Sequence, residues 1–157
     1  MSELKVLTWG EYLDEIEEMY SNILQKFSIK EPFTIVGISR GGLIPLTILA
    51  SRFQKKKVDV ISIDSYDETS KKSVGLNFHF SSLKLENLEN RILVIDDLID
   101  SGTTILGVLE HIIKIKPDCK ITVAVLYINR NTPMPKNNLI VNQVKDPGTW
   151  IQFPYEV

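Results

Sequence analysis

The feature that most constrains the fold is the apolar run from Arg91 to Ile95, Arg-Ile-Leu-Val-Ile, which gives the strongest buried-strand signal in the chain. An amphipathic helix pattern follows over Thr104 to Lys116, and a further strand is predicted from Ile121 to Ile128. Strand, helix and strand in this order favour a parallel sheet with helices packed on it. In such sheets, ligands bind beyond the carboxyl ends of the strands.

The N-terminal half shows the same alternation. Thr8-Trp9-Gly10-Glu11 has the spacing of a capping box, and apolar residues behind it recur at three- and four-residue steps up to Phe27. A strand is predicted over Phe33 to Ile38, a helix over Leu43 to Phe53, and a second strand over Val58 to Ile63.

Three other segments give weaker patterns. The polar stretch from Asp64 to Ser73 is predicted to be a loop, and Val74 to Phe80 an arm or hairpin strand. The segments after Ile128 contain several prolines and are predicted to be irregular. A chain of 157 residues suits one domain, so we expect an α/β fold over residues 1–157, with a doubly wound, mostly parallel sheet and flanking helices.

Composition excludes several classes of function. The net charge of −2 provides no basic excess for binding a nucleic-acid backbone. A lone cysteine, Cys119, fits a reducing compartment, and two histidines are too few for a histidine-rich metal site. The N-terminus has no signal-peptide pattern and no run of 18 apolar residues occurs, so we expect a cytoplasmic protein.

The most informative motif follows the strongest strand. Asp96 and Asp97 are adjacent carboxylates at its carboxyl end, and a loop rich in glycine and hydroxyl groups then opens a helix. Backbone N–H groups, hydroxyls and the positive end of a helix dipole together suit a phosphate monoester. The carboxylates can accept hydrogen bonds from sugar hydroxyls or hold Mg²⁺ through water. The motif predicts a ribose phosphate site; the alternative is a capped helix beside two solvated aspartates.

A second glycine-containing turn, Ser39-Arg40-Gly41-Gly42, follows the strand predicted to end at Ile38. Glycines there let the backbone approach an anion closely, although an ordinary strand-to-helix turn explains the pattern equally well. The run from Gly37 to Gly42 lacks the G-x-G-x-x-G fingerprint, which argues against a dinucleotide.

The segment from Ile92 to Thr104 resembles the phosphoribosyl-pyrophosphate signature of type I phosphoribosyltransferases. The resemblance implies the fold of that family, with a small hood region, and Mg²⁺ as cofactor. It implies contacts to the sugar donor from Ser39, Arg40, Gly41, Lys72, Asp96, Asp97, Leu98, Ile99, Asp100, Ser101, Gly102, Thr103 and Thr104.

The resemblance also implies roles for these residues. Asp96 and Asp97 contact the ribose hydroxyls and the metal, with Asp97 as the metal ligand, and Asp100 to Thr104 cradle the 5′-phosphate. Asp100 also faces N7 of a purine and manages its proton. Together with Arg40, which neutralises the leaving pyrophosphate, these aspartates form the expected catalytic set.

The rest of the chain is similar to bacterial xanthine-guanine phosphoribosyltransferases. The loop Ser39 to Gly42 is similar to their pyrophosphate loop, which implies a cis peptide between Ser39 and Arg40. Ser65-Tyr66-Asp67 resembles the start of their mobile hood loop, in which Lys72, or Lys71 as second choice, reaches the pyrophosphate. Without the resemblance, both lysine side chains are predicted to be exposed to solvent and to have no role in binding.

The base site is expected near the C-terminus. Trp150 stacks on the purine and the Ile151 carbonyl meets the exocyclic group at C2, whereas a tryptophan in such a tail is otherwise a core residue. The subfamily has a lysine that donates to O6 just after the strand over Val123–Tyr127, and here Asn129 or Arg130 takes its place. A preference for 6-oxopurines is therefore left open at this stage.

These observations predict transfer of the phosphoribosyl group to guanine, xanthine or hypoxanthine in purine salvage. A different base, a regulator that senses phosphoribosyl pyrophosphate, and a generic nucleotide-binding module are the alternatives. We expect the sugar donor and a purine base as partners, no nucleic acid, no membrane other than peripherally, and a homo-oligomer, either dimer or tetramer.

Overall fold

The computed structural model describes residues 2–68, 73–133 and 138–156. Its elements are, in chain order, β1 (Glu3–Val6), α1 (Trp9–Lys26), β2 (Thr34–Ser39), α2 (Leu43–Arg52), β3 (Asp59–Glu68), β4 (Ser73–Ser81), the 3-10 helix η1 (Leu85–Asn87), β5 (Arg91–Ile99), α3 (Thr103–Ile115), β6 (Lys120–Asn129), β7 (Leu139–Lys145) and β8 (Thr149–Gln152).

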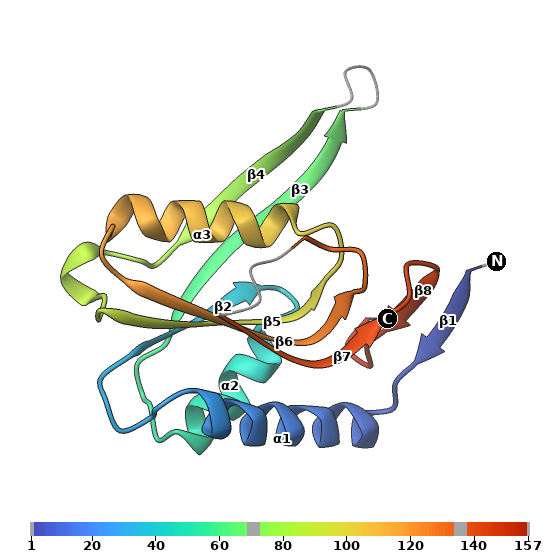
Figure 1. Cartoon of the computed structure of the whole chain (residues 1–157), viewed down its shortest axis with the longest axis horizontal. Coiled ribbons are helices and arrows are strands. Elements are labelled where there is room, and N and C mark those ends of the chain that lie inside the picture. The colour runs from blue at the N-terminus through green and yellow to red at the C-terminus, as the bar shows by residue number, and fades with distance from the viewer. Residues whose placement is uncertain (1, 69–72, 134–137, 157) are drawn as a thin grey trace.

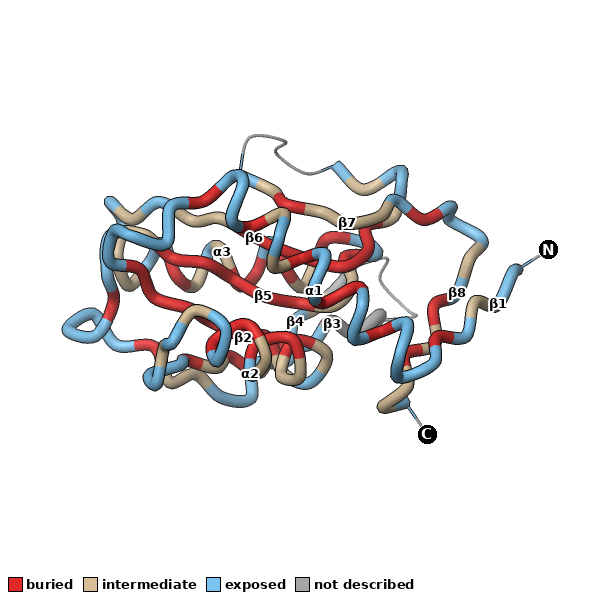
Figure 2. Tube along the Cα trace, turned by 90° about the horizontal axis from the view of Figure 1, so that it is seen from below, coloured by how far each residue is buried: buried red, intermediate tan, exposed pale blue. Residues whose placement is uncertain are grey.

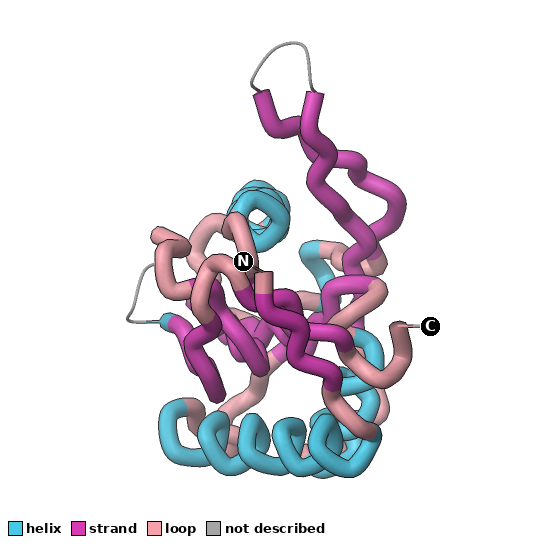
Figure 3. The backbone as a smooth tube through the Cα atoms, turned by 90° about the vertical axis from the view of Figure 1, so that its right-hand side faces the viewer, coloured by secondary structure: helices cyan, strands magenta, loops and turns pink. Residues whose placement is uncertain are grey.

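The central sheet has the strand order β4-β3-β2-β5-β6-β7. All its neighbouring strands pair in parallel except β3 and β4, which form an antiparallel hairpin. Helices α1 and α2 cover one face of the sheet and α3 covers the other (Figures 1 and 3). The predicted doubly wound α/β fold is therefore confirmed.

The two faces of the sheet carry separate hydrophobic clusters. Ile16 of α1 and Leu49 of α2 pack in the cluster that contains Leu93 of β5, whereas Val108 of α3 packs in the cluster that contains Val94. Successive side chains of a strand point to opposite faces, so β5 contributes to both clusters. A central strand covered on both faces is continuously apolar, and Figure 2 shows β5 buried along most of its length.

The topology opens a crevice between β2 and β5. These strands are neighbours, but the chain leaves β2 through α2 toward β3 and leaves β5 through α3 toward β6, on the opposite side. The loops after the two strands therefore diverge at the carboxyl edge of the sheet. The small parallel sheet of β1 and β8 also belongs to this end of the molecule (Figure 1).

Two predictions of secondary structure were wrong. The expected loop from Asp64 to Ser73 is largely strand, because β3 continues to Glu68 and β4 starts at Ser73. The tail expected to be irregular contains β7 and β8, which pair with β6 and β1. In both cases backbone pairing with a neighbouring strand imposes the extended conformation, which the side-chain pattern alone does not reveal.

Lys71 and Lys72, the candidates for the hood loop, lie outside the described residues. Among the helices that are described, none combines the length and apolar character needed to cross a bilayer.

Helix α1 begins with the predicted capping box. The Thr8 hydroxyl accepts a hydrogen bond from the Glu11 N–H at 3.1 Å, and the Glu11 carboxylate accepts from the Thr8 N–H at 2.9 Å. We predict that Thr8→Ala lowers the free energy of unfolding by about 1 kcal/mol, because the helix loses its N-terminal acceptor. Urea denaturation measures the change, and Thr8→Ser, which keeps the hydroxyl, is the control. Equal stability of Thr8→Ala and the unaltered protein would contradict the capping role.

Candidate functional site

Two adjoining cavities lie at the carboxyl edge of the sheet. The first has a volume of about 400 Å³ and the second about 1100 Å³. Both are lined by Ser39, the last residue of β2, by Asp97 of β5 and by Trp150 of β8, so they meet at these residues. The crevice predicted by the topology thus brings together residues from distant parts of the sequence.

The loop between β5 and α3 forms one wall of the first cavity. The residues that line it are Leu98 and Ile99 at the end of β5, Asp100, Ser101 and Gly102 of the loop, and Thr104 in the first turn of α3. Gly102 has a φ of 85°, a conformation that glycine adopts without steric cost, and α3 begins at the next residue. The loop therefore presents the N-terminus of α3, where backbone N–H groups and the helix dipole favour an anion. Thr103, also predicted to contact the sugar donor, does not line the cavity, and its N–H donates to the Ser101 hydroxyl at 3.3 Å.

The two acidic residues after the apolar run differ in environment. Both line the first cavity, but β5 continues past them to Ile99, and Asp96 is only 9% exposed. Burial and the neighbouring Asp97 raise the pKa of Asp96 well above its ordinary value, while one Asp96 oxygen accepts from the Asp97 N–H at 2.9 Å. The interpretation of both as solvated strand-end carboxylates is therefore wrong for Asp96, because the strand does not end there.

Asp97 is oriented by the C-terminal segment. The Tyr155 hydroxyl donates to Asp97 Oδ2. The Tyr155 ring stacks on Phe153, with ring centroids 5.7 Å apart, and contacts Tyr12 edge-on. Burial and the charge of Asp97 raise the pKa of Tyr155, so its hydroxyl remains a donor. No local pattern in the sequence indicates this role, because only the fold brings Tyr155 next to Asp97.

The second cavity is lined by the loop after β2. Ser39, Arg40 and Gly41 contribute to it, and the Ser39–Arg40 peptide is cis, as the resemblance predicted. Gly41 lies against the carboxylate of Asp97, so a side chain at this position would collide with it. The absence of a Cβ is what allows this loop to approach β5.

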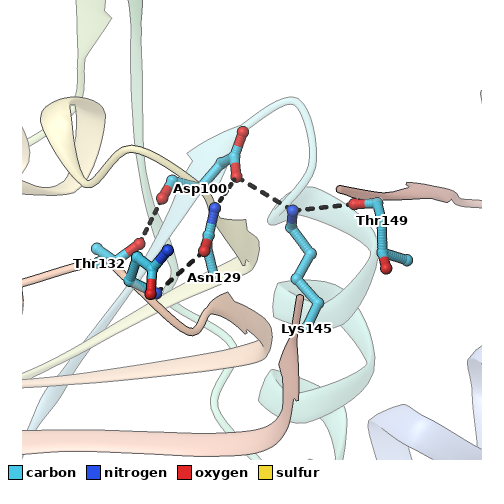
Figure 4. Close-up of polar contacts among 6 residues, drawn as sticks. Asp100, Asn129, Thr132, Lys145 and Thr149 are labelled. Carbon is cyan, nitrogen blue, oxygen red and sulfur yellow. Dashed lines mark hydrogen bonds and ion pairs between the residues drawn. The ribbon is translucent and has the colours of Figure 1, made fainter. Parts of the chain in front are cut away.

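Three polar side chains contact Asp100, as Figure 4 shows. The Asn129 amide donates to Asp100 Oδ1 at 2.9 Å, and the Thr132 hydroxyl donates to the Asp100 backbone carbonyl. Lys145 Nζ lies 3.2 Å from Asp100 Oδ1 and donates to the Thr149 carbonyl at 3.0 Å. The hydrogen bond from Asn129 and the nearby Lys145 ammonium lower the pKa of Asp100, and partial burial opposes them. Asp100 is therefore ionised at neutral pH.

Asn129 and Arg130, the residues expected to donate to the purine O6, lie outside the first cavity. Neither Asn129 nor Arg130 lines the first cavity; Asn129 contacts Asp100, and Arg130 pairs with Asp146 at 2.9 Å. Lys145 does line it, and sequence reasoning missed this residue. Its position just before the segment with Trp150 was the available signal, but the strand that carries it was not predicted.

Trp150 and Ile151 lie at the cavity as predicted. Trp150 is 64% exposed and lines both cavities, so the alternative interpretation as a core residue is wrong. The side chain of Ile151 is buried, and the residue lines the first cavity. A large exposed aromatic face next to a polar cavity suits stacking on a planar ring.

The side chains near the two cavities limit how a metal ion could be bound directly. Within the described part of the chain, no cluster of three or more histidine, cysteine or acidic residues could hold a metal ion by itself. Asp97, half-buried and lining both cavities, offers a carboxylate. Mg²⁺ is usually bound by one or two carboxylates together with substrate phosphates and water, so this arrangement fits it.

Comparisons with known proteins agree with this geometry. A family model described as phosphoribosyl transferase domain matches residues 5–157. The chain is 28% identical to the xanthine-guanine phosphoribosyltransferase of Idiomarina loihiensis over 123 residues, which are 78% of this chain and 70% of the relative.

Solved structures share the fold. The xanthine-guanine-hypoxanthine phosphoribosyltransferase of Helicobacter pylori matches with a TM-score of 0.78 and 23% identity over 99% of this chain and 95% of the other. The purine phosphoribosyltransferase of Pyrococcus horikoshii matches with a TM-score of 0.77 and 24% identity over the same shares of the two chains.

The contact between Gly41 and Asp97 generates a prediction. Gly41→Ala should displace the Asp97 carboxylate and weaken binding of phosphoribosyl pyrophosphate, the sugar donor that the resemblance implies, about tenfold, or about 1.4 kcal/mol, measured by calorimetry. Gly10→Ala is the matched control, because a Cβ there meets only the Thr8 hydroxyl, at 3.9 Å. Unchanged affinity in Gly41→Ala would show that the close approach does not position Asp97.

Proposed function

The chain belongs to the phosphoribosyl transferase domain family, and on this basis we propose that it transfers the 5-phosphoribosyl group from phosphoribosyl pyrophosphate to a purine base, guanine, xanthine or hypoxanthine. The observation that carries the proposal is the first cavity, which combines the loop at the N-terminus of α3, Asp97 and Trp150. These suit a phosphate, a sugar diol and a planar base, in that order. The names of the relatives in the comparisons support a purine.

Each part of the sugar donor has a matching group. The 5′-phosphate binds the loop Asp100–Thr104, all of whose residues except Thr103 line the first cavity, and the ribose hydroxyls bind the carboxyl groups of Asp96 and Asp97. The pyrophosphate binds in the second cavity, beside the Ser39–Gly41 loop, where Arg40 faces its charge. Mg²⁺ held at Asp97 would neutralise charge on the departing pyrophosphate.

The reaction is a displacement at the anomeric carbon through an oxocarbenium-like transition state. The chain holds the sugar and the base in line: the base stacks on Trp150, and the ionised Asp100 accepts a hydrogen bond from N7–H. No side-chain nucleophile is needed. We place all of these steps within one domain, residues 1–157, and assign the enzyme to purine salvage.

The enzyme is favoured over a regulator that only senses the sugar donor. A sensor needs the phosphate loop, whereas catalysis also needs groups at the leaving pyrophosphate and at the base. Arg40 lines the second cavity, and Asp100 and Trp150 line the first. Both ends of the reaction therefore have residues in place.

Purified protein should release pyrophosphate when phosphoribosyl pyrophosphate, Mg²⁺ and a purine base are supplied together. The panel consists of guanine, xanthine, hypoxanthine, adenine and uracil, and omission of the base is the control. Turnover with at least one of the first three bases is expected. Turnover with uracil alone, or with none of the five, would overturn the proposal.

Replacement of Asp97 tests the sugar and metal site. Asp97→Asn should keep the fold, since the side chain is half-buried at the cavity, and should lower kcat/KM about 100-fold or more, because the charge that faces the sugar and Mg²⁺ is lost. Asp118→Asn, an exposed position before β6, is the charge-matched control. Near-normal catalysis by Asp97→Asn is the result that would contradict the assignment.

A further inference from the structure

Lys145 lies beside Asn129, one of the two residues expected to donate to the purine O6, on the neighbouring strand of the sheet. It is the last residue of β7, and in the parallel pairing of β6 with β7 its partner is Asn129, the last residue of β6. The Arg130 N–H also donates to the Lys145 carbonyl at 2.9 Å. The two strand ends therefore lie side by side, and a group carried by one can be supplied by the other.

The environment of the Lys145 ammonium suits a ligand contact. Its side chain is only 6% exposed, yet the residue lines the first cavity together with Trp150 and Ile151. Lysine is rarely buried to this degree unless it is paired. Asp100 and the Thr149 carbonyl are the two acceptors that the described residues provide, whereas an ammonium has three N–H donors.

Arg130, the other candidate from the sequence, faces away from the cavity. Its guanidinium pairs with Asp146, its side chain is 63% exposed, and the residue lines a separate hollow with Ile128 and Val144. Asn129 uses its amide on Asp100, which holds that carboxylate in position. Lys145 is thus the cationic side chain that lines the cavity among Asn129, Arg130 and Lys145.

We propose that Lys145 donates a hydrogen bond to the exocyclic oxygen at C6 of the purine, and that Asn129 acts as a positioning residue for Asp100. This assignment rests on the proposed function and adds the residue that selects the base. Lys145, the residue of β7 paired with Asn129, would take the donor role expected at the end of β6, and its amine lies beside Asp100 in the cavity that Trp150 also lines.

The proposal fixes the base preference that the sequence left open. An asparagine amide can turn over and offer either a donor or an acceptor, whereas an ammonium only donates. A 6-oxopurine offers Lys145 an acceptor, and the amino group of adenine offers it another donor. The enzyme should therefore prefer guanine, xanthine or hypoxanthine over adenine.

The test compares Lys145→Met with the unaltered enzyme, using pyrophosphate release with guanine, hypoxanthine and adenine. The variant should lose about 10- to 100-fold in kcat/KM for guanine and hypoxanthine, the range expected when a buried acceptor loses its partner. Its KM for phosphoribosyl pyrophosphate should change less than threefold. Lys120→Met, an exposed position at the opposite end of the sheet, is the matched control.

A second variant separates base recognition from folding. Lys145→Gln keeps a polar group that can face Thr149 and Asp100, and its amide can turn over, so the ratio of guanine to adenine turnover should fall about tenfold or more. Where adenine turnover is too slow to measure, calorimetry with GMP and AMP gives the same ratio. An unchanged ratio in Lys145→Gln would overturn the proposal, as would loss of the preference in Arg130→Met instead.

The exchange variant Asn129→Lys/Lys145→Asn completes the design. It returns the lysine to β6 and should recover guanine turnover to within about tenfold of the unaltered enzyme, because the two positions are register partners. Recovery of guanine turnover supports the proposal that a lysine at either position can donate to the base. A loss of guanine turnover as large as that in Lys145→Met contradicts it. If the unaltered protein itself uses no purine, the proposed function fails, and this assignment fails with it.

Discussion

The parallel pairing of β2 with β5 determines where the site lies. The crossovers after these two strands run in opposite directions, so the loops that follow them face each other across the crevice instead of packing on one side. The glycines after β2 make this approach possible: Gly41 lies against the Asp97 carboxylate and Gly42 against the Ile95 backbone carbonyl. Both cavities lie at this junction, and a side chain at either glycine would push the loop after β2 away from β5.

The C-terminal segment completes the site from the other end of the chain. β8 pairs with β1, which places Trp150 beside the cavities, and Tyr155 then reaches back to Asp97. Stacking of Tyr155 on Phe153, which is itself buried in the cluster that contains Leu93, connects the orientation of Asp97 to the core. The two cavities are therefore bounded by β8, which pairs with β1, as well as by the central sheet.

The three aspartates Asp96, Asp97 and Asp100 differ in burial and in the groups that contact them. Asp96 is buried with a raised pKa, Asp97 is half-buried and held by a tyrosine hydroxyl, and Asp100 is exposed with a lowered pKa beside an amide and an ammonium. Alternation along β5 and the turn after it account for these differences, because each residue meets a different neighbour. Residues close together in the sequence can therefore differ in charge and in exposure to the cavities.

The amino-acid sequence by itself determined the central strand, the loop at the start of α3 and the turn after β2, because contiguous residues form each of them and local hydrogen bonding and apolar patterning decide their conformation. It did not determine the length of the β3–β4 hairpin or the existence of β7, whose extended backbone depends on pairing with distant strands. For the same reason, the sequence pointed to Asn129 and Arg130 as donors to the base, whereas only the register of β6 with β7 brings Lys145 to the first cavity. Residues 16 positions apart in the chain become neighbours through the sheet, and no local pattern records that contact.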